Sequence, residues 1–212
     1  FAGYDVALPT EYAYKSKSEG GIWEEGDLRR DESIRYDFTY LGITPTEVSW
    51  GADELDPHIK KYEDERTDQF NGNLANEWYS GKNFIVLRYA DVLLCYAECL
   101  NELGETGEAN TVVNQVRARA WGGTLPNEMA WNYGQDEFRV QIMDERIREL
   151  CFEGWRRMDL IRTGKFVELI KERNPWAKKS GTIKEFHMRW PIPDTEIKNN
   201  SDISEEDQNP GY

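Results

Sequence analysis

The chain has 212 residues, enough for one large domain or two small ones, and 39% of them are hydrophobic, which is compatible with a packed core. Its formal net charge of −14 opposes attraction to phosphate backbones and to anionic lipid, so nucleic acid is not an expected partner. No apolar run approaches the roughly 20 residues that cross a bilayer. Two His and three Cys offer no metal-ligand spacing, so neither a metal nor another cofactor is expected.

Residues 1–83 carry no sustained helical period and are rich in Gly, Pro, Asp and aromatic residues, which predicts loops with short strands. Within them the run GDLRRD (26–31) places acidic and basic residues side by side. We interpret this run as a turn held by ion pairs rather than as a catalytic group. Residues 1–83 are therefore expected to be a loop-rich segment of the same domain as a helical region at 84–212.

The stretch 84–120 predicts two antiparallel helices joined by a tight turn. Gly104 is expected to end the first helix, because glycine adopts the left-handed conformation without a steric penalty, and Thr106 is the expected N-cap of the second. Cys95 and Cys99 are expected to be buried on the first helix. Six residues at spacings of three and four form the predicted apolar face of that helix: Val86, Tyr89, Leu93, Tyr96, Leu100 and Leu103. The inward residues expected in the second helix are Ala109, Val112, Val113 and Val116.

The hairpin also fits the pattern of a tetratricopeptide repeat, with Ala97 and Ala109 at its small positions. A stable array needs at least three stacked repeats, and the sequence contains a single unit. Two interpretations stay open at this point. The unit either caps an array whose other members lie outside the chain, or it is an ordinary helical hairpin.

A second long helix is predicted from Gln135, followed by a shorter helical piece that ends at Gly164 and a helix from Lys165 that Pro175 stops. Pro191 and Pro193 then fix an extended course. The anchors expected for this extended segment are Trp190 and Ile192. The apolar face expected for the long helix consists of Val140, Met143, Ile147, Leu150 and Cys151.

Charges of both signs alternate along ERIRELCFEGWRRMDL (145–160), beside large apolar residues. This pattern indicates partly buried, hydrogen-bonded ion pairs, which suit a scaffold better than an active site. A carboxylate beside an Arg stays ionised, which is the wrong state for a general acid near neutral pH. No catalytic residue is assigned on this basis, and we do not expect an enzyme.

Five stretches resemble, in this order, the C-terminal part of SusD/RagB family proteins: RYADVLLCYAECLNELG (88–104), NQVRARA (114–120), ERIRELCFEGWRRMDLIRTG (145–164), WPIP (190–193) and QNPGY (208–212). Members of that family are outer-membrane nutrient-binding lipoproteins of Bacteroidetes that work with a SusC-like TonB-dependent transporter. The resemblance implies a mostly α fold, with a tetratricopeptide-like hairpin, a helical bundle, irregular loops and a few short strands. It also implies that a lipid-anchored N-terminal half lies outside this chain.

For function, the resemblance implies non-enzymatic glycan binding at the cell surface, with delivery of oligosaccharide to the partner transporter. The membrane is then contacted only through the N-terminal lipid anchor. A flat aromatic side chain can cover the apolar face of a sugar ring. The stacking candidates are aromatic residues in predicted loops: Trp23, Trp50, Trp78, Tyr79, Trp121 and Trp131. The alternative is a helical-repeat module that binds a protein partner and no carbohydrate.

Overall fold

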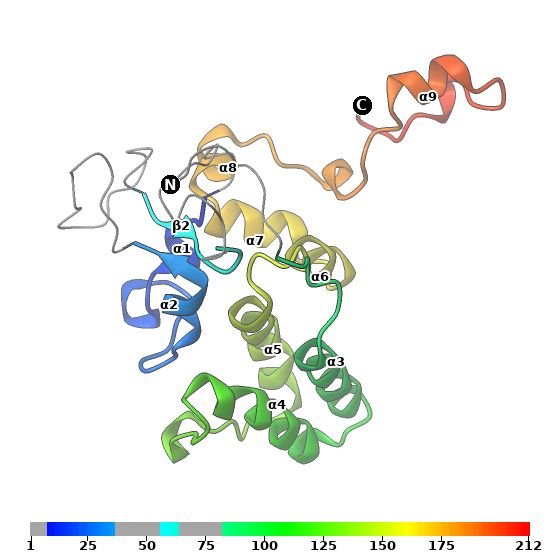
Figure 1. Ribbon diagram of the computed structural model, residues 1–212. Coiled ribbons are helices and arrows are strands. Elements are labelled where there is room, and N and C mark those ends of the chain that lie inside the picture. The colour runs from blue at the N-terminus through cyan, green and yellow to red at the C-terminus, as the bar shows by residue number, and fades with distance from the viewer. Residues whose placement is uncertain (1–7, 37–55, 64–81) are drawn as a thin grey trace, which may run out of the picture. The chain divides into compact units, whose positions relative to one another are not determined.

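The computed structural model describes residues 8–36, 56–63 and 82–212 (Figure 1). It divides into two compact units, Phe1–Arg156 and Arg157–Tyr212, and each is described by itself. Helices make up most of the regular structure in both, so the predicted mostly α class is confirmed. The division that the sequence suggested at residue 83 stays a prediction.

The first unit contains the long helices and the short strands of the described chain. Strands β1 and β2 pair antiparallel, with Ile34 opposite Ile59. Short 3-10 turns lie at Lys17–Glu19 and Asn127–Met129. The helices and strands are α1 (Glu11–Tyr14), α2 (Arg29–Ser33), β1 (Ile34–Arg35), β2 (His58–Ile59), α3 (Tyr89–Glu102), α4 (Thr106–Ala120) and α5 (Gln135–Leu150).

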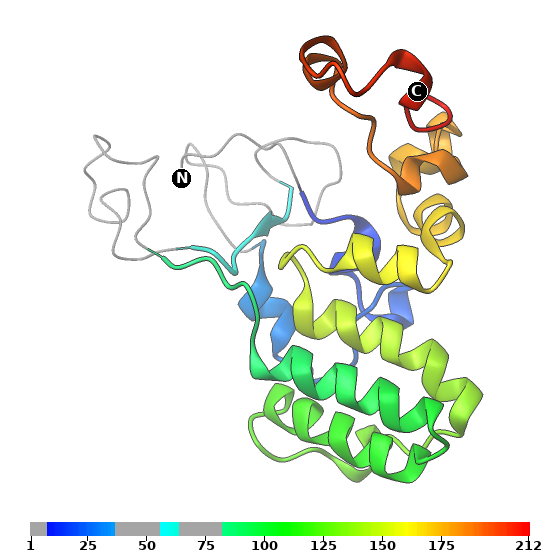
Figure 2. The same cartoon turned by 90° about the vertical axis from the view of Figure 1, so that its right-hand side faces the viewer.

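Helices α3 and α4 form the predicted antiparallel hairpin, and α5 packs beside α3 (Figure 2). Gly104 ends α3 with φ of +85°, and the amide of Glu105 donates to the carbonyl of Leu100 at 2.9 Å, which closes the last turn. The predicted N-cap is wrong by one residue, because Glu105 is the N-cap and Thr106 is already helical. The Thr106 hydroxyl instead donates to the side chain of Asn101 at 2.9 Å.

The main core lies between these three helices. Ala97 of α3 and Ala109 of α4 are fully buried, so the small positions of the repeat pattern bring the two helix backbones close together. Trp131 and Phe138 close the core from the α4–α5 connection and from α5. The buried members of this core are Leu94, Ala97, Leu100, Ala109, Val112, Val113, Val116, Trp131, Phe138, Ile142 and Leu150.

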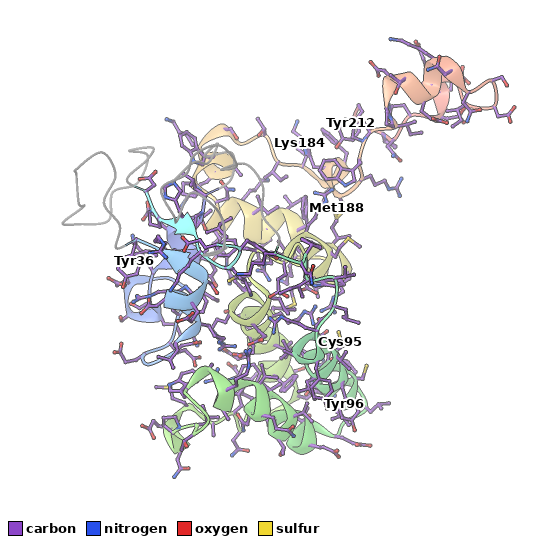
Figure 3. All side chains as sticks on the ribbon, viewed as in Figure 1. Tyr36, Cys95, Tyr96, Lys184, Met188 and Tyr212 are labelled. Carbon is purple, nitrogen blue, oxygen red and sulfur yellow. The ribbon has the colours of Figure 1, made fainter. Side chains whose placement is uncertain are left out.

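The apolar face predicted for α3 is largely wrong. Tyr89, Tyr96 and Leu103 are 73%, 48% and 75% exposed, whereas Leu94 and Ala97 are fully buried. Cys95 and Cys99 are exposed as well, although the Cys95 sulfur accepts from the guanidinium of Arg146 on α5 at 3.4 Å. Figure 3 shows Tyr96 on the side of α3 away from α5. The reason is that α3 is apolar on two sides, and periodicity alone does not say which side faces the core. Of the remaining residues of the predicted face, Leu100 is buried, Leu93 is partly buried and Val86 is exposed.

The face predicted for α5 is also partly wrong. Val140 is 63% exposed, and Phe138 and Ile142 are buried in its place. Met143 and Leu150 are buried as predicted. Charged side chains of α5 are buried too, because they meet partners from segments far away in the sequence, as described below.

The second unit is built from short helices and turns. The predicted helix, α7, ends at Arg173 just before Pro175, as expected. Pro175 also begins the next helix, α8, where the missing amide of proline is harmless at the first helical position. Asn174 caps that helix, since its side chain accepts from the amides of Trp176 and Ala177 at 3.0 and 3.1 Å. The elements are α6 (Arg156–Arg162), which begins at the boundary, α7 (Phe166–Arg173), α8 (Pro175–Ser180) and α9 (Asp194–Asn199), with 3-10 turns at Glu185–Met188 and Glu205–Asp207.

The C-terminal stretches WPIP and QNPGY are joined by side-chain hydrogen bonds. The Gln208 amide group accepts from the Ile192 amide at 2.8 Å and donates to the Ile192 carbonyl at 3.0 Å, as a paired strand would. Asn209 donates to the carbonyl of Trp190 at 2.7 Å. The extended course of this segment is confirmed, but Trp190 is 71% exposed, so burial of its indole does not anchor the segment as predicted.

Candidate functional site

A dense group of charged side chains surrounds the C-terminal half of α5. The carboxylates of Glu145 and Glu149 lie one helical turn apart with no exposed surface, and Glu153 follows just beyond the helix. We call these three carboxylates and their basic partners the α5 cluster. The basic partners are Arg29 of α2, Lys61 after β2, Arg88 before α3, Arg117 and Arg119 of α4, and Arg148 of α5 itself.

Glu145 is the centre of the α5 cluster. Its carboxylate accepts from three guanidinium groups: Arg29 at 2.7 Å, Arg117 at 2.9 Å and Arg148 at 2.8 Å. Burial alone would raise the pKa of this carboxyl. The positive charges of Arg29, Arg148 and Arg117 outweigh burial and hold the pKa of Glu145 well below its usual range, so the group is ionised.

Glu149 and Glu153 extend the same pattern. Glu149 accepts from Arg29 at 3.0 Å and also from Arg88 and Arg119. Arg88 bridges to Glu153 at 2.8 Å, and the ammonium of Lys61 lies 2.5 Å from the same carboxylate. Burial favours a higher pKa for Glu153, but the bonds from Arg88 and Lys61 hold the pKa below its ordinary value.

A pocket of about 290 Å³ lies within the α5 cluster. Its walls are charged, and no aromatic ring is among its lining residues, so it offers no flat surface for a sugar ring. The basic groups of its walls already hold carboxylates, although the Arg119 side chain is 64% exposed. The lining residues are Arg29, Glu32, Ser33, Lys61, Ile85, Arg88, Arg119, Arg148 and Glu149.

The α5 cluster is built to hold the fold together. Its ion pairs fasten α2, the segment after β2, the start of α3 and the end of α4 to α5. Carboxylates kept ionised by guanidinium groups are poor general acids near neutral pH. Within the described residues, no group of three His, Cys, Asp or Glu side chains is arranged to hold a metal ion.

Trp23 and Trp131, two of the predicted stacking residues, lie inside the first unit. Trp23 is 2% exposed, and its indole N–H donates to the Ala13 carbonyl at 2.6 Å. Trp131 is 4% exposed and packs against the rings of Tyr133 and Phe138, with ring centroids 5.1 and 5.5 Å away. Both indoles contribute to packing in this structure, and their stacking role stays a prediction.

Among the predicted residues that the structure describes, Trp121 is half-buried. The buried guanidinium of Arg117 lies 4.9 Å from its ring and 5.4 Å from the ring of Trp131, so the cation sits against both indoles. The indole N–H of Trp121 donates to the carbonyl of Glu25 at 3.3 Å. This ring is therefore held in place and remains partly accessible.

The other three predicted residues, Trp50, Trp78 and Tyr79, lie outside the described residues. In the second unit, two indoles that the sequence reasoning did not select are widely exposed: Trp176 at 73% and Trp190 at 71%. The guanidinium of Arg157 lies 4.3 Å from the Trp190 ring and also donates to a backbone carbonyl. The polar run NPWAKKS around Trp176 was a signal of exposure that could have identified it.

The chain therefore has a mostly α, tetratricopeptide-like fold that the buried ion pairs of the α5 cluster hold together. Among the described residues, no helix is long and apolar enough to span a membrane. A profile of the SusD family matches residues 9–212, and the chain belongs to the SusD family. The resemblance to this family inferred from the five stretches is thereby confirmed.

Several named proteins are similar to this chain in sequence or in fold. SusD-like protein P38 of Formosa agariphila is 41% identical over 155 residues, which is 70% of this chain and 28% of that protein. The starch-binding protein SusD of Bacteroides thetaiotaomicron is 28% identical over 225 residues, covering 98% of this chain and 37% of SusD. A crystal structure of a SusD homolog from the same organism superposes with a TM-score of 0.64 at 25% identity, over 88% of this chain and 41% of that one. This chain thus spans well under half the length of these proteins.

Proposed function

We propose that this chain takes part in capturing glycan at the surface of the bacterial outer membrane, and that the glycan is bound without being cleaved. The observation that carries the proposal is the SusD-family match across residues 9–212, together with a relative that is named for binding starch. In the proposal the captured oligosaccharide passes to a SusC-like TonB-dependent transporter. The complete protein is held at the cell surface by an N-terminal lipid anchor.

The chemistry of the α5 cluster supports binding over hydrolysis. Glycoside hydrolysis needs two carboxyl groups across a cleft, one of them protonated to act as the acid. Glu145 and Glu153 have lowered pKa values and are held by Arg and Lys side chains, so neither is poised to donate a proton. Their role in the proposal is to keep the frame rigid.

Among the described stacking candidates, Trp121 fits the proposed role best. It is partly accessible, and its contact with Arg117 fixes the plane of the ring before a ligand arrives, which lowers the entropy lost on binding. Trp50, Trp78 and Tyr79 remain candidates from the sequence. A groove that combines Trp121 with polar neighbours would cover one face of a sugar ring and bond its hydroxyls.

Isothermal titration calorimetry with the whole chain tests glycan binding. Amylopectin is the first ligand, followed by a panel of purified neutral and acidic polysaccharides. We expect saturable binding to at least one of them and weaker binding by the Trp121→Ala variant. Trp176→Ala is the matched control, because it removes an exposed indole from the second unit. Absence of heat with every polysaccharide would reject the proposal.

The transporter and the location need separate experiments. We expect an affinity-tagged protein to copurify with a TonB-dependent barrel from outer membranes of its host, and extracellular protease to remove it from intact cells. If the tagged protein is recovered without any barrel protein, the transporter is no longer part of the proposal. Resistance to protease in intact cells, with digestion after lysis, would remove surface display.

A second candidate function is a helical module that binds a protein partner and no carbohydrate. The observation in its favour is the exposed apolar side of α3. Tight binding to a soluble protein, combined with no response to any polysaccharide in the calorimeter, would favour this second function over glycan capture.

A further inference from the structure

The charges of the second unit are separated along the chain. This unit has ten basic and ten acidic residues, so the whole net charge of −14 belongs to the first unit. Between positions 157 and 189 there are nine basic and four acidic residues, whereas one basic and six acidic residues follow from position 190 to position 212. The part of the second unit that contains α7 and α8 is therefore basic, and the part that contains α9 is acidic.

Three lysines at and just after α8 have no acidic partner. Other cations of this basic part are compensated locally, as Lys165 is by Glu168 at 2.9 Å. By contrast, Lys178, Lys179 and Lys184 are exposed and form no ion pair with any residue that the structure describes. Figure 3 labels Lys184 on the segment that follows α8. Ammonium groups in this state are available to an anion from solution.

An exposed indole lies beside these lysines. Trp176 belongs to the first turn of α8 and is 73% exposed. Lys179 follows it at a spacing of three, which makes the two side chains neighbours on the helix surface. The surface of α8 thus presents a flat ring next to a positive charge. We call Trp176, Lys178, Lys179 and Lys184 the α8 patch.

Helix α8 is fixed at both ends, so its surface is formed before any ligand arrives. At the first turn, the Asn174 side chain accepts from the amides of Trp176 and Ala177. At the last turn, the Gly181 amide donates to the Ala177 carbonyl at 3.0 Å, and Gly181 has φ of +63°. Contact groups that are held in place lose less entropy on binding than mobile ones.

The α8 patch matches a sugar ring that carries a negative charge. An indole can cover the apolar face of a pyranose ring. A carboxylate or sulfate group projects from the edge of such a ring, where the ammonium of Lys179 can meet it with a charge-assisted hydrogen bond. An ammonium is a compact charge that does not require the planar, two-pronged geometry of a guanidinium, so it suits both anions.

A lipid bilayer is the other anionic surface that a helix with Trp and Lys can meet. Helices that lie on a bilayer bury an apolar face built from several large side chains. Helix α8 has six residues, and Trp176 is its one large apolar side chain. A single ring is sufficient to stack on a sugar but gives little apolar area to insert into lipid, which favours the sugar.

We propose that the α8 patch binds acidic oligosaccharides, with a sugar ring stacked on Trp176 and its carboxylate or sulfate group paired with Lys179. Lys178 and Lys184 add to the positive field that attracts the anion. This assignment rests on the proposed capture of glycan and adds a ligand class and a second contact to it. A neutral glycan offers nothing to the lysines, so Trp176→Ala remains the control for neutral ligands.

Calorimetric titration of the whole chain with matched oligosaccharides tests the proposal. Tetragalacturonate has a carboxylate on every ring, and its methyl ester has the same rings without the charge. A sulfated galactan tetrasaccharide replaces carboxylate by sulfate, so the two acidic ligands show which anion is preferred. We expect tetragalacturonate or the sulfated ligand to bind at least about tenfold more tightly than the methyl ester. Added salt should weaken this binding, because exposed charges are screened.

Variants locate the contact. Lys179→Gln should weaken binding of the acidic ligand about twofold to fivefold, the range of an exposed ion pair, and Trp176→Ala about twofold to tenfold. Changing Lys178, Lys179 and Lys184 to Gln together should weaken it about tenfold or more. Lys198→Gln, which removes an exposed lysine of α9, is the matched control and should leave the affinity unchanged. Because all these side chains are exposed, circular dichroism should show every variant folded.

The possible results separate this proposal from glycan capture itself. Absence of binding by every neutral and acidic glycan rejects both. Binding of a neutral glycan without any response to the acidic ligands rejects the α8 patch alone. The same holds if the methyl ester binds as tightly as the acidic ligands, or if neither Lys179→Gln nor Trp176→Ala weakens acidic binding. Adsorption to phosphatidylglycerol vesicles that the triple Lys variant abolishes, without binding of acidic oligosaccharide, would assign the α8 patch to a membrane.

Discussion

Helices α3 and α5 depart from the usual distribution of side chains in opposite directions. Helix α5 buries Glu145, Arg148 and Glu149, while α3 exposes Tyr89 and Tyr96. The buried charges are compensated where they lie, because each carboxylate meets several cations. The exposed apolar residues have no such compensation within the described chain. The comparison teaches that α5 completes the frame from within, whereas α3 carries apolar side chains on its exposed side as well as in the core.

Removing a carboxylate from the α5 cluster should have the largest effect on stability. Glu145→Ala leaves three guanidinium groups without their shared partner in a buried site, and the expected loss of unfolding free energy is about 3–5 kcal/mol. Urea denaturation followed by circular dichroism measures it. Glu102→Ala is the control, since it breaks a surface pair with Arg139 and should change the midpoint far less. Equal effects of the two variants would contradict the comparison.

The second largest effect should be the difference in stability loss between substitutions on the two sides of α3. Leu94→Ala opens a cavity in a fully buried site and should cost about 2–5 kcal/mol. Leu103→Ala, at a position that is 75% exposed, should change stability by no more than about 0.5 kcal/mol. Thermal unfolding of both variants provides the measurement. A large loss of stability from Leu103→Ala in the isolated chain would show that this exposed position is already covered.

Acid should weaken the α5 cluster in a defined pH range. The pKa of Glu145 is lower in the folded chain than its ordinary value of 4.5, because Arg29, Arg148 and Arg117 outweigh the effect of burial. A carboxyl with a lowered folded pKa contributes full stability above its ordinary pKa and loses that contribution as the pH falls through the lowered value.

Urea midpoints measured from pH 7 downward should therefore stay level until about pH 4.5 and then fall. The decline should be shallower in Glu145→Gln, which starts from a lower stability and has no carboxyl to titrate at this position. A variant curve parallel to that of the parent chain would show that Glu145 does not drive the acid sensitivity.

The smallest expected effect concerns the proposed ligand. Trp121→Ala should weaken glycan binding by about 0.5–1.5 kcal/mol, the typical contribution of a favourable aromatic contact. Competition binding against a labelled oligosaccharide resolves a change of this size. Unchanged affinity, with the fold intact, would move the stacking surface away from Trp121 and toward other candidates.

The sequence predicted the positions of α3, α4 and α5 well, because their ends carry clear local signals, whereas the short helices α1, α2, α8 and α9 were not predicted. Gly104 is an example, because its left-handed backbone conformation ends α3 and glycine adopts that conformation without help from distant residues. The buried side of α3 was not predictable from spacing, because Leu94 and Tyr96 both belong to regular apolar rows. Which row is covered depends on α4 and α5, whose approach is a property of the tertiary structure.

For the α5 cluster, the sequence predicted the type of interaction but not the partners. Alternating charges near Glu145 and Glu149 indicated ion pairs, but one of their main partners, Arg29, lies 116 positions before Glu145. Likewise, loop aromatics such as Trp23 and Trp131 could not be separated from core aromatics by composition. A loop position does not decide exposure when the loop packs back onto a helix.

The most direct test of the central claim, that this protein holds glycan on a charged but non-catalytic frame, is the chain length of a polysaccharide recovered after binding. A purified oligosaccharide that binds the chain is incubated with it, eluted and analysed by mass spectrometry. The account predicts that every molecule is recovered at its original length, with the parent chain and with Glu145→Gln. Shorter products that appear with the parent chain and disappear with Glu145→Gln would contradict it.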